Sequence, residues 1–150
     1  MIELQMMRER GRGMGRFSVE VDLANFLDAA KAENKELATD QVRRVRLRGV
    51  VDSGASRLVL PATIVKQLGL KPKRKVRVRY ADGRRGLRDE VGGVQLTMEG
   101  RTGIFKAVVA PKRETALIGA IVLEDLDFLV DCDRQRLVPR DPKYVVSEIE

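Results

Sequence analysis

Apolar and polar residues alternate strictly near the beginning of the chain, in the stretch RFSVEVDL (residues 16–23). The apolar positions are Phe17, Val19, Val21 and Leu23. This period of two predicts a half-buried β-strand. A second strand is predicted for residues 42–52, VRRVRLRGVVD, which end in two valines and an aspartate. The stretch between the two strands, residues 24–40, is rich in Ala, Leu, Glu and Lys and predicts a short helix or an ordered insertion loop.

A short helix and a hairpin are predicted next. Residues 60–70, LPATIVKQLGL, favour a helix with Pro61 at its first position and Gly69 as its end. Residues 75–91 favour a β-hairpin whose turn is formed by Ala81, Asp82 and Gly83.

The last part of the chain is also predicted to form short strands and one short helix. Residues 92–111 predict a further hairpin that turns at Glu99 and Gly100. Residues 116–139 predict a brief helix and two strands around a turn from Cys132 to Gln135. Together, the predicted elements indicate a mostly β fold with two or three short helices.

Composition favours one aliphatic core. Hydrophobic residues make up 43% of the 150 residues, aromatic residues only 4%, and tryptophan is absent, so Val, Leu and Ala must fill the interior. We expect residues 17–150 to form a single domain. Residues 1–16 place several arginines among glycines with almost nothing to bury, which predicts a disordered basic lead-in. Either Met1 or Met14 can serve as the native start.

The charge is positive: 29 basic and 22 acidic side chains leave a net charge of +7. A positive net charge is compatible with a polyanion or an acidic protein as a partner. A well-solvated surface explains the same charge without any partner. The single cysteine, Cys132, cannot form an internal disulfide, and the chain has no signal peptide and no apolar run of about 20 residues. We therefore expect a soluble cytoplasmic protein that does not associate with membranes.

Histidine is absent from the whole sequence. This excludes Ser-His-Asp and Cys-His nucleophilic schemes, zinc sites with histidine ligands and histidine general bases. Any chemistry must use carboxylates, lysine, tyrosine, cysteine or serine.

The stretch VVDSGASRLVLP, residues 50–61, places an Asp-Ser-Gly-Ala turn between two aliphatic runs. Asp, Ser and Gly are also the residues of ordinary turns. Here, however, the turn is flanked by residues of the core type, and a carboxylate among apolar residues carries a desolvation cost. Asp52 is therefore a candidate functional residue.

Two motifs resemble those of the retropepsin-like (retroviral-type) aspartic peptidases, especially their small bacterial and archaeal-type members. The family pattern is two aliphatic residues, Asp, Thr or Ser, Gly and Ala, followed later by two aliphatic residues and Gly. The matching residues are Val50, Val51, Asp52, Ser53, Gly54 and Ala55 in the first motif, and Leu117, Ile118 and Gly119 in the second. The resemblance covers roughly Phe17 to Pro139. It implies a closed, β-barrel-like half of an acid protease.

The resemblance also implies an aspartic endopeptidase that cuts peptide or protein substrates without a cofactor or metal. In such enzymes two close carboxylates share one proton and together activate a water molecule. Asp52 is the only aspartate of this chain that is followed by Ser-Gly or Thr-Gly. The catalytic pair would therefore require a homodimer in which each subunit contributes its Asp52.

The resemblance assigns supporting roles around Asp52. The hydroxyl of Ser53 would tie the two active-site loops together. Gly54 would permit a backbone conformation and a close approach that a Cβ would block, and Ala55 would keep the entrance narrow. Leu117, Ile118 and Gly119 would pack against that loop.

The hairpin from Val76 to Val91 would be a flap that closes over the substrate. Its tip contains Tyr80, Ala81, Asp82, Gly83 and Arg84. Retroviral flaps are glycine-rich and apolar at the tip, so this charged tip departs from the family pattern. It could favour acidic or polar peptides, or it could be a solvated turn.

Three other signals have simpler explanations. The strand KPKRKVRVR, residues 71–79, places Lys75, Arg77 and Arg79 on one face, which could hold phosphates. Few aromatic residues accompany them for base stacking, so an exposed strand face explains them and nucleic acid is not expected as a partner.

A cation site could be suspected at four aspartates: Asp125, Asp127, Asp131 and Asp133. Their spacing lacks the glycine and the terminal glutamate of an EF-hand, so a helix end and a turn explain them. Cys132 has no histidine or second cysteine to activate it, which favours a role as a small hydrophobic residue.

Two alternatives to a peptidase stay open. One is a catalytically inactive peptide-binding homologue, and the other is a basic nucleic-acid-binding β domain.

Overall fold

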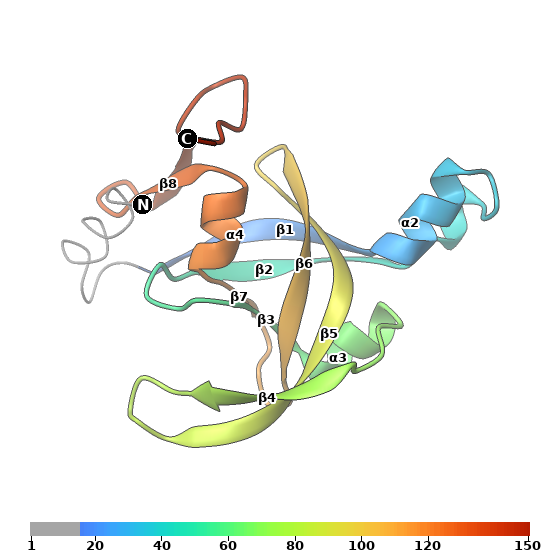
Figure 1. Ribbon diagram of the computed structural model, residues 1–150, viewed down its shortest axis with the longest axis horizontal. Coiled ribbons are helices and arrows are strands. Elements are labelled where there is room, and N and C mark those ends of the chain that lie inside the picture. The colour runs from blue at the N-terminus through green and yellow to red at the C-terminus, as the bar shows by residue number, and fades with distance from the viewer. Residues whose placement is uncertain (1–15) are drawn as a thin grey trace.

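The computed structural model describes residues 16–150 (Figure 1). The expected lead-in at residues 1–16 therefore lies outside the described residues, except for Arg16. The elements in chain order are β1 (Phe17–Asn25), α2 (Phe26–Glu33), the 3-10 turn η1 (Thr39–Gln41), β2 (Arg44–Val51), β3 (Leu58–Pro61), α3 (Ala62–Gln67), β4 (Arg74–Arg79), β5 (Arg85–Met98), β6 (Arg101–Ala110), β7 (Ala116–Ile118), α4 (Ala120–Asp125), β8 (Phe128–Asp131) and β9 (Arg136–Pro139).

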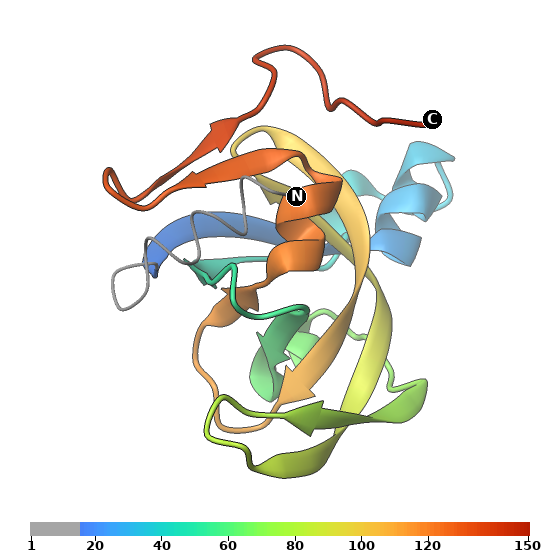
Figure 2. The ribbon, with the colours of Figure 1, turned by 60° about the vertical axis from the view of Figure 1, so that its left-hand side comes forward.

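The main sheet has the strand order β1-β2-β7-β3-β6-β5-β4. Because β1 also pairs with β5, six of these strands close into a ring, and β4 extends outward from it on β5 (Figures 1 and 2). Strands β8 and β9 form a small second sheet. The mostly β fold with a closed, barrel-like sheet and short helices is confirmed.

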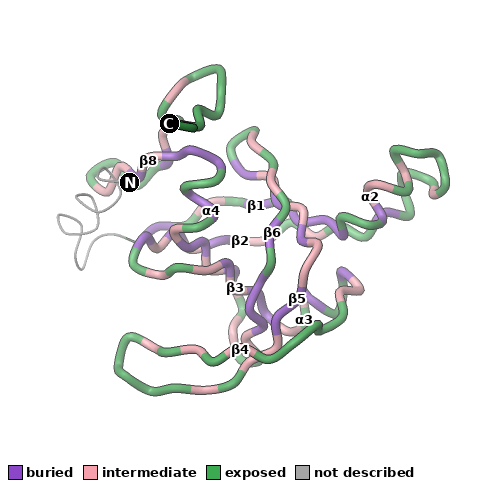
Figure 3. Tube along the Cα trace, viewed as in Figure 1, coloured by how far each residue is buried: buried purple, intermediate pink, exposed green. Residues whose placement is uncertain are grey.

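The interior of the ring is aliphatic, as composition predicts. β1 buries Phe17, Val21 and Leu23 and half-buries Val19, which confirms the alternation of this strand. Figure 3 shows the buried positions following the strands of the ring, whereas the projecting β4–β5 hairpin is largely exposed or intermediate. No helix in the described residues has the length and apolar character needed to cross a membrane.

The stretch between β1 and β2 contains a real helix, α2. The side chain of Asn25 caps it by accepting a hydrogen bond from the Asp28 backbone at 3.0 Å. Arg43 holds the Asp28 carboxylate with two side-chain hydrogen bonds of 2.7 and 3.0 Å, and these hydrogen bonds hold the pKa of Asp28 below its usual value. The insertion is therefore ordered and tied to the start of β2.

The two hairpins predicted for residues 75–91 and 92–111 share one continuous strand, β5. The glycine pair at Gly92 and Gly93 looks like a break between hairpins, but it forms a bulge: the register shifts between Val91 and Val94, and Gly93 has φ +68°. A bulge bends a strand without ending it. The predicted turn at Glu99 and Gly100 is confirmed, with φ of 49° and 79°.

Two short strands were not predicted. Residues 58–61 were expected to run into a helix at Pro61, but they form β3, and Pro61 caps α3, which begins at Ala62. Residues 116–118 form β7. Both strands are too short to show a period, and their partners lie about fifty or more residues away in the chain. Non-local pairing, not local pattern, determines them.

Candidate active site

Asp52 follows β2 directly, at the point where the chain leaves the sheet. Its backbone N–H donates to the Ile118 carbonyl at 3.0 Å, and its carbonyl accepts from the Ala55 N–H at 3.1 Å. The Gly54 N–H donates to Oδ1 of Asp52 at 2.9 Å. The side chain remains 17% exposed. The carboxylate is therefore held by a tight turn on the edge of the core, with one side open.

The structure brings the two sequence motifs together. Strands β2 and β7 run parallel, with Val50 beside Leu117 and Val51 beside Ile118. Immediately after β7, the Ala120 N–H donates to the Ala55 carbonyl at 2.7 Å. The second motif thus packs against the Asp52 loop through both the sheet and the start of α4.

Close approach excludes a Cβ at Gly119 and would crowd one at Gly54. A Cβ at Gly119 would lie 2.7 Å from the Arg57 nitrogen and 2.8 Å from the Ser56 carbonyl carbon, both backbone atoms. A Cβ at Gly54 would lie 3.1 Å from Oδ1 of Asp52. Gly54 is not among the residues with positive φ, so the structure shows no left-handed backbone at this position. The expected role of Gly54 stays a prediction.

Ser53 is buried in the loop, with 5% of its surface exposed. Its hydroxyl makes no hydrogen bond to any residue between 16 and 150. Ala55, two positions on, is half-buried beside it. A polar side chain with so little exposure ordinarily has a partner.

Arg16 forms an ion pair with Asp52 that no sequence pattern indicates. Its Nη2 lies 2.9 Å from Oδ2 of Asp52, and its side chain is 69% exposed. The open oxygen of Asp52 is therefore covered by a cation from the residue that precedes β1.

The hairpin of β4 and β5 turns at the predicted residues. The Tyr80 N–H donates to the Arg84 carbonyl at 2.8 Å, and Gly83 has φ +88°. Nε of Arg84 lies 2.7 Å from Asp82, and the guanidinium of Arg84 lies over the Tyr80 ring. Ala81 is exposed at the tip. Figure 2 shows the hairpin extending from the ring near the loop that joins β6 to β7.

Glu90 links the base of this hairpin to the Asp52 loop. No sequence pattern predicts this link. The residue is 3% exposed. Its carboxylate accepts hydrogen bonds of 2.6 Å from Arg57, which follows the motif, and from Arg74 at the start of β4. The hydrogen bonds from Arg74 and Arg57 lower the pKa of Glu90 to about 2. Three segments distant in the chain are thereby joined at one carboxylate.

We expect Glu90→Gln to destabilise the protein at pH 7 by about 1–3 kcal/mol, because it removes charge-assisted hydrogen bonds from a buried position. The pKa of Glu90 is lower in the folded state than its ordinary value of 4.5. Its contribution is therefore fully present above about pH 4.5 and is lost as the pH falls toward about 2. Urea unfolding at several pH values should show the gap between wild type and variant closing over this range.

The neighbouring Asp89→Asn is the matched control, since Asp89 is half-buried and pairs with Lys75, whose side chain is exposed. It should change the free energy of unfolding by less than about 1 kcal/mol. Equal stability of wild type and Glu90→Gln at pH 7 would contradict a structural role for the Glu90 pair.

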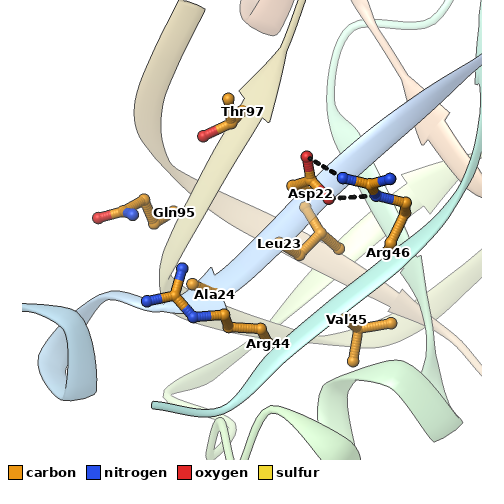
Figure 4. A pocket seen from close by; sticks show the side chains of 8 residues that line it. All are labelled: Asp22, Leu23, Ala24, Arg44, Val45, Arg46, Gln95 and Thr97. Atoms are coloured by element: carbon orange, nitrogen blue, oxygen red, sulfur yellow. Dashed lines mark hydrogen bonds and ion pairs between the residues drawn. The ribbon is translucent and has the colours of Figure 1, made fainter. Parts of the chain in front are cut away.

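A hollow of about 480 Å³ lies elsewhere, over β1, β2 and β5 (Figure 4). Its lining residues are Asp22, Leu23, Ala24, Arg44, Val45, Arg46, Gln95 and Thr97. None of these is a residue of the two motifs or of the flap. Figure 4 shows Asp22 and Arg46 paired across the two strands, at 2.7 Å.

The other predicted clusters lie apart from Asp52. On β4, Lys75, Arg77 and Arg79 are exposed and the valines between them are half-buried, so this alternation is confirmed. Asp127 pairs with Arg140 at 2.9 Å after α4. Within the described residues, no three acidic or cysteine side chains are close enough to hold a metal ion.

The remaining acidic positions follow the expected local structure. Asp125 is the last residue of α4, and Oδ1 of Asp131 accepts from the Arg134 N–H at 3.1 Å in the turn after β8. Cys132 and Asp133 lie in that same turn.

The family model for aspartyl proteases matches residues 38–122, more than half of the chain and a span that contains both motifs. The chain belongs to the aspartyl protease family. The resemblance drawn from Asp52-Ser53-Gly54 and Leu117-Ile118-Gly119 is therefore confirmed. A bacterial or archaeal type stays a prediction.

Solved structures of viral proteases are similar to the chain. The simian foamy virus (mac) protease is 14% identical over 71% of this chain and 91% of its own, with a TM-score of 0.46. The EIAV protease, in complex with an inhibitor, is 23% identical over 54% and 77%, with a TM-score of 0.44. The foamy viral protease-reverse transcriptase, with an RNA/DNA hybrid, is 13% identical over 83% and 12%, with a TM-score of 0.48. No curated protein sequence matches the chain significantly.

Proposed function

We propose that the protein is an aspartic endopeptidase whose residues 17–150 form one catalytic domain. Its nucleophile is a water molecule activated by two Asp52 carboxylates, one from each subunit of a homodimer. The observation that carries the proposal is the position of Asp52: a motif aspartate of an aspartyl protease family member, held by a tight turn, with a carboxylate that is 17% exposed and is covered by the exposed side chain of Arg16. The proposal places the enzyme in the cytoplasm, since its single cysteine forms no internal disulfide.

Two carboxylates are needed because the reaction moves protons in both directions. Two close carboxylates cannot both ionise, so one keeps a proton. The ionised one accepts a proton from water as the water oxygen bonds to the peptide carbonyl carbon. The protonated one donates to the carbonyl oxygen. When the tetrahedral intermediate collapses, the protonated carboxylate gives its proton to the nitrogen and the C–N bond breaks. One hydroxyl of the intermediate returns its proton to the ionised carboxylate, so the pair again holds one proton.

One feature of the single chain fits a second subunit at this point. Ser53 is 5% exposed, and its hydroxyl makes no hydrogen bond within residues 16–150, so it keeps its capacity to donate and to accept for another group. A facing loop would supply a partner. The Arg16 side chain, which is 69% exposed, would have to move from Asp52 or be shared between the two carboxylates when the second subunit binds.

The β4–β5 hairpin would close over bound substrate. Its base is fixed to the Asp52 loop through Glu90 and Arg57, whereas its tip is exposed. A hairpin that is rigid at its base and free at its tip suits a closing element, which excludes water from the reaction.

The test is digestion of a diverse peptide mixture by the wild-type protein between pH 3 and pH 8, with cleavage products identified by mass spectrometry. We expect cleavage, with an activity per molecule that rises with protein concentration as dimers form. Sedimentation at the same concentrations measures the dimer. Absence of cleavage at every pH, or cleavage by a strictly monomeric protein, would contradict the proposal. Peptides that bind without being cut would indicate the inactive homologue instead.

A further inference from the structure

Positive charge gathers around Asp52 in excess of what its carboxylate balances. Arg16 already pairs with Asp52. A second arginine, Arg113, lies in the loop between β6 and β7, half-buried. Burial lowers the pKa of Arg113, repulsion from Arg16 lowers it further, and Asp52 acts in the opposite direction. The guanidinium of Arg113 is therefore close enough to both charges to feel them.

The position of Arg113 is fixed by its own loop. Nε donates to the Thr115 carbonyl at 2.8 Å, and Nη2 donates to the Thr115 hydroxyl at 3.3 Å. The next residue after Thr115 begins β7, which pairs with β2, the strand that ends directly before Asp52. Arg113 is thus built onto the same element that supports the Asp52 loop, and it keeps N–H groups free for a further acceptor.

A third arginine, Arg88, lies on the face of the hairpin that is turned toward the Asp52 loop. Side chains two residues apart on a strand share a face. Glu90 reaches Arg57 of that loop, so Arg88 shares the facing side. In the register of the hairpin, Arg88 lies opposite Val76, which is half-buried.

Arg88 has no carboxylate partner within residues 16–150. Its guanidinium lies 5.7 Å from the Tyr80 ring centroid, Nη1 donates to the Leu87 carbonyl at 2.8 Å, and Nε is buried without a hydrogen bond. Arg113 also lacks a direct ion pair with a described residue. Glu90, the other nearby carboxylate, is already saturated by two arginines. Arg113 and Arg88 are thus two half-buried arginines without an ion pair among residues 16–150, one near Asp52 and the other on the hairpin.

We propose that Arg113 and Arg88 select peptides that carry an aspartate or glutamate close to the bond that is cut. The inference rests on the proposed peptidase function and names its substrate class. A guanidinium binds a carboxylate through two parallel hydrogen bonds, which gives both charge and geometric selection. With the hairpin closed, Arg88 approaches the substrate from above and Arg113 from the side of β7.

The experiment begins with the cleavage sites found in the peptide mixture, which should be enriched in Asp and Glu near the cut bond. One such peptide is then compared with its Glu→Gln counterpart. We expect the wild type to cut the glutamate peptide with a kcat/KM about tenfold higher or more, mainly through KM. Arg113→Gln and Arg88→Gln should each reduce this preference severalfold. Arg46→Gln, an exposed arginine paired with Asp22 at the distant hollow, is the control and should keep it.

The outcomes separate the two proposals. Cleavage of both peptides at equal rates by the wild type would overturn the substrate preference and leave the peptidase function standing. Cleavage of no peptide at any pH would overturn the peptidase function itself. If a variant fails to fold, salt tests the preference without any substitution: raising ionic strength should reduce the glutamate preference of the wild type. A preference that is unchanged by salt would contradict it.

Discussion

Replacement of Asp52 with asparagine is expected to reduce peptide cleavage by about three orders of magnitude or more. Asparagine has the same shape and keeps an oxygen that accepts the hydrogen bond of 2.9 Å from the Gly54 N–H. It cannot accept a proton from water, so the nucleophile is no longer activated. The change also removes the ion pair with Arg16. Because the Arg16 side chain is 69% exposed, we expect this loss to have little effect on stability.

Thermal unfolding and sedimentation of the Asp52→Asn variant should therefore resemble those of the wild type. The matched control is Asp22→Asn, an exposed aspartate paired with Arg46 away from the loop, which should retain cleavage. Activity of Asp52→Asn within about tenfold of wild type would show that Asp52 is not the catalytic carboxylate.

Replacement of Gly119 with alanine is expected to destabilise the protein by about 3 kcal/mol or more and to abolish cleavage. The added methyl group would meet backbone atoms of Ser56 and Arg57, with separations of 2.7 and 2.8 Å to two of them and less to the Arg57 carbonyl oxygen. Backbone atoms cannot move aside as a side chain can, so the Asp52 loop itself must shift. Urea unfolding and the peptide assay measure the two effects.

Gly92→Ala is the control for this substitution, because a Cβ at Gly92 would meet no atom within 4 Å and its φ is not positive. It should change the free energy of unfolding by less than about 1 kcal/mol. A Gly119→Ala variant as stable and active as Gly92→Ala would contradict the close packing of the second motif on the loop.

Local sequence patterns predicted the elements whose structure is decided locally. The alternation of Phe17, Val21 and Leu23 specifies β1, and positive-φ residues such as Gly83 and Gly100 mark the hairpin turns. Local patterns did not predict the elements whose structure is determined by long-range strand pairing. β3 and β7 exist because each is paired on both sides, and β5 stays continuous because the glycines that resemble a break form a bulge.

The same distinction between local patterns and long-range contacts holds for the candidate site. Each motif, the Asp52 loop and residues 117–119, is one short continuous stretch of sequence, so its residue types identify it. The structure brings the two stretches together. Their catalytic and supporting roles stay predictions. The link from Glu90 to Arg57 and Arg74 joins three separate segments, and the Arg16 pair depends on where the chain enters β1. No local pattern predicts such contacts, because the residues that make them come from separate parts of the chain.

The central claim is that one active site requires an intact Asp52 from each of two subunits. Mixing tests it most directly: wild type and Asp52→Asn are combined in equal amounts, allowed to exchange subunits, and assayed at constant total protein concentration. Random pairing leaves about one quarter of the dimers with two intact Asp52 residues, so activity should fall to about one quarter of that of pure wild type. Activity of about one half would mean that each subunit cuts alone and would contradict the shared site.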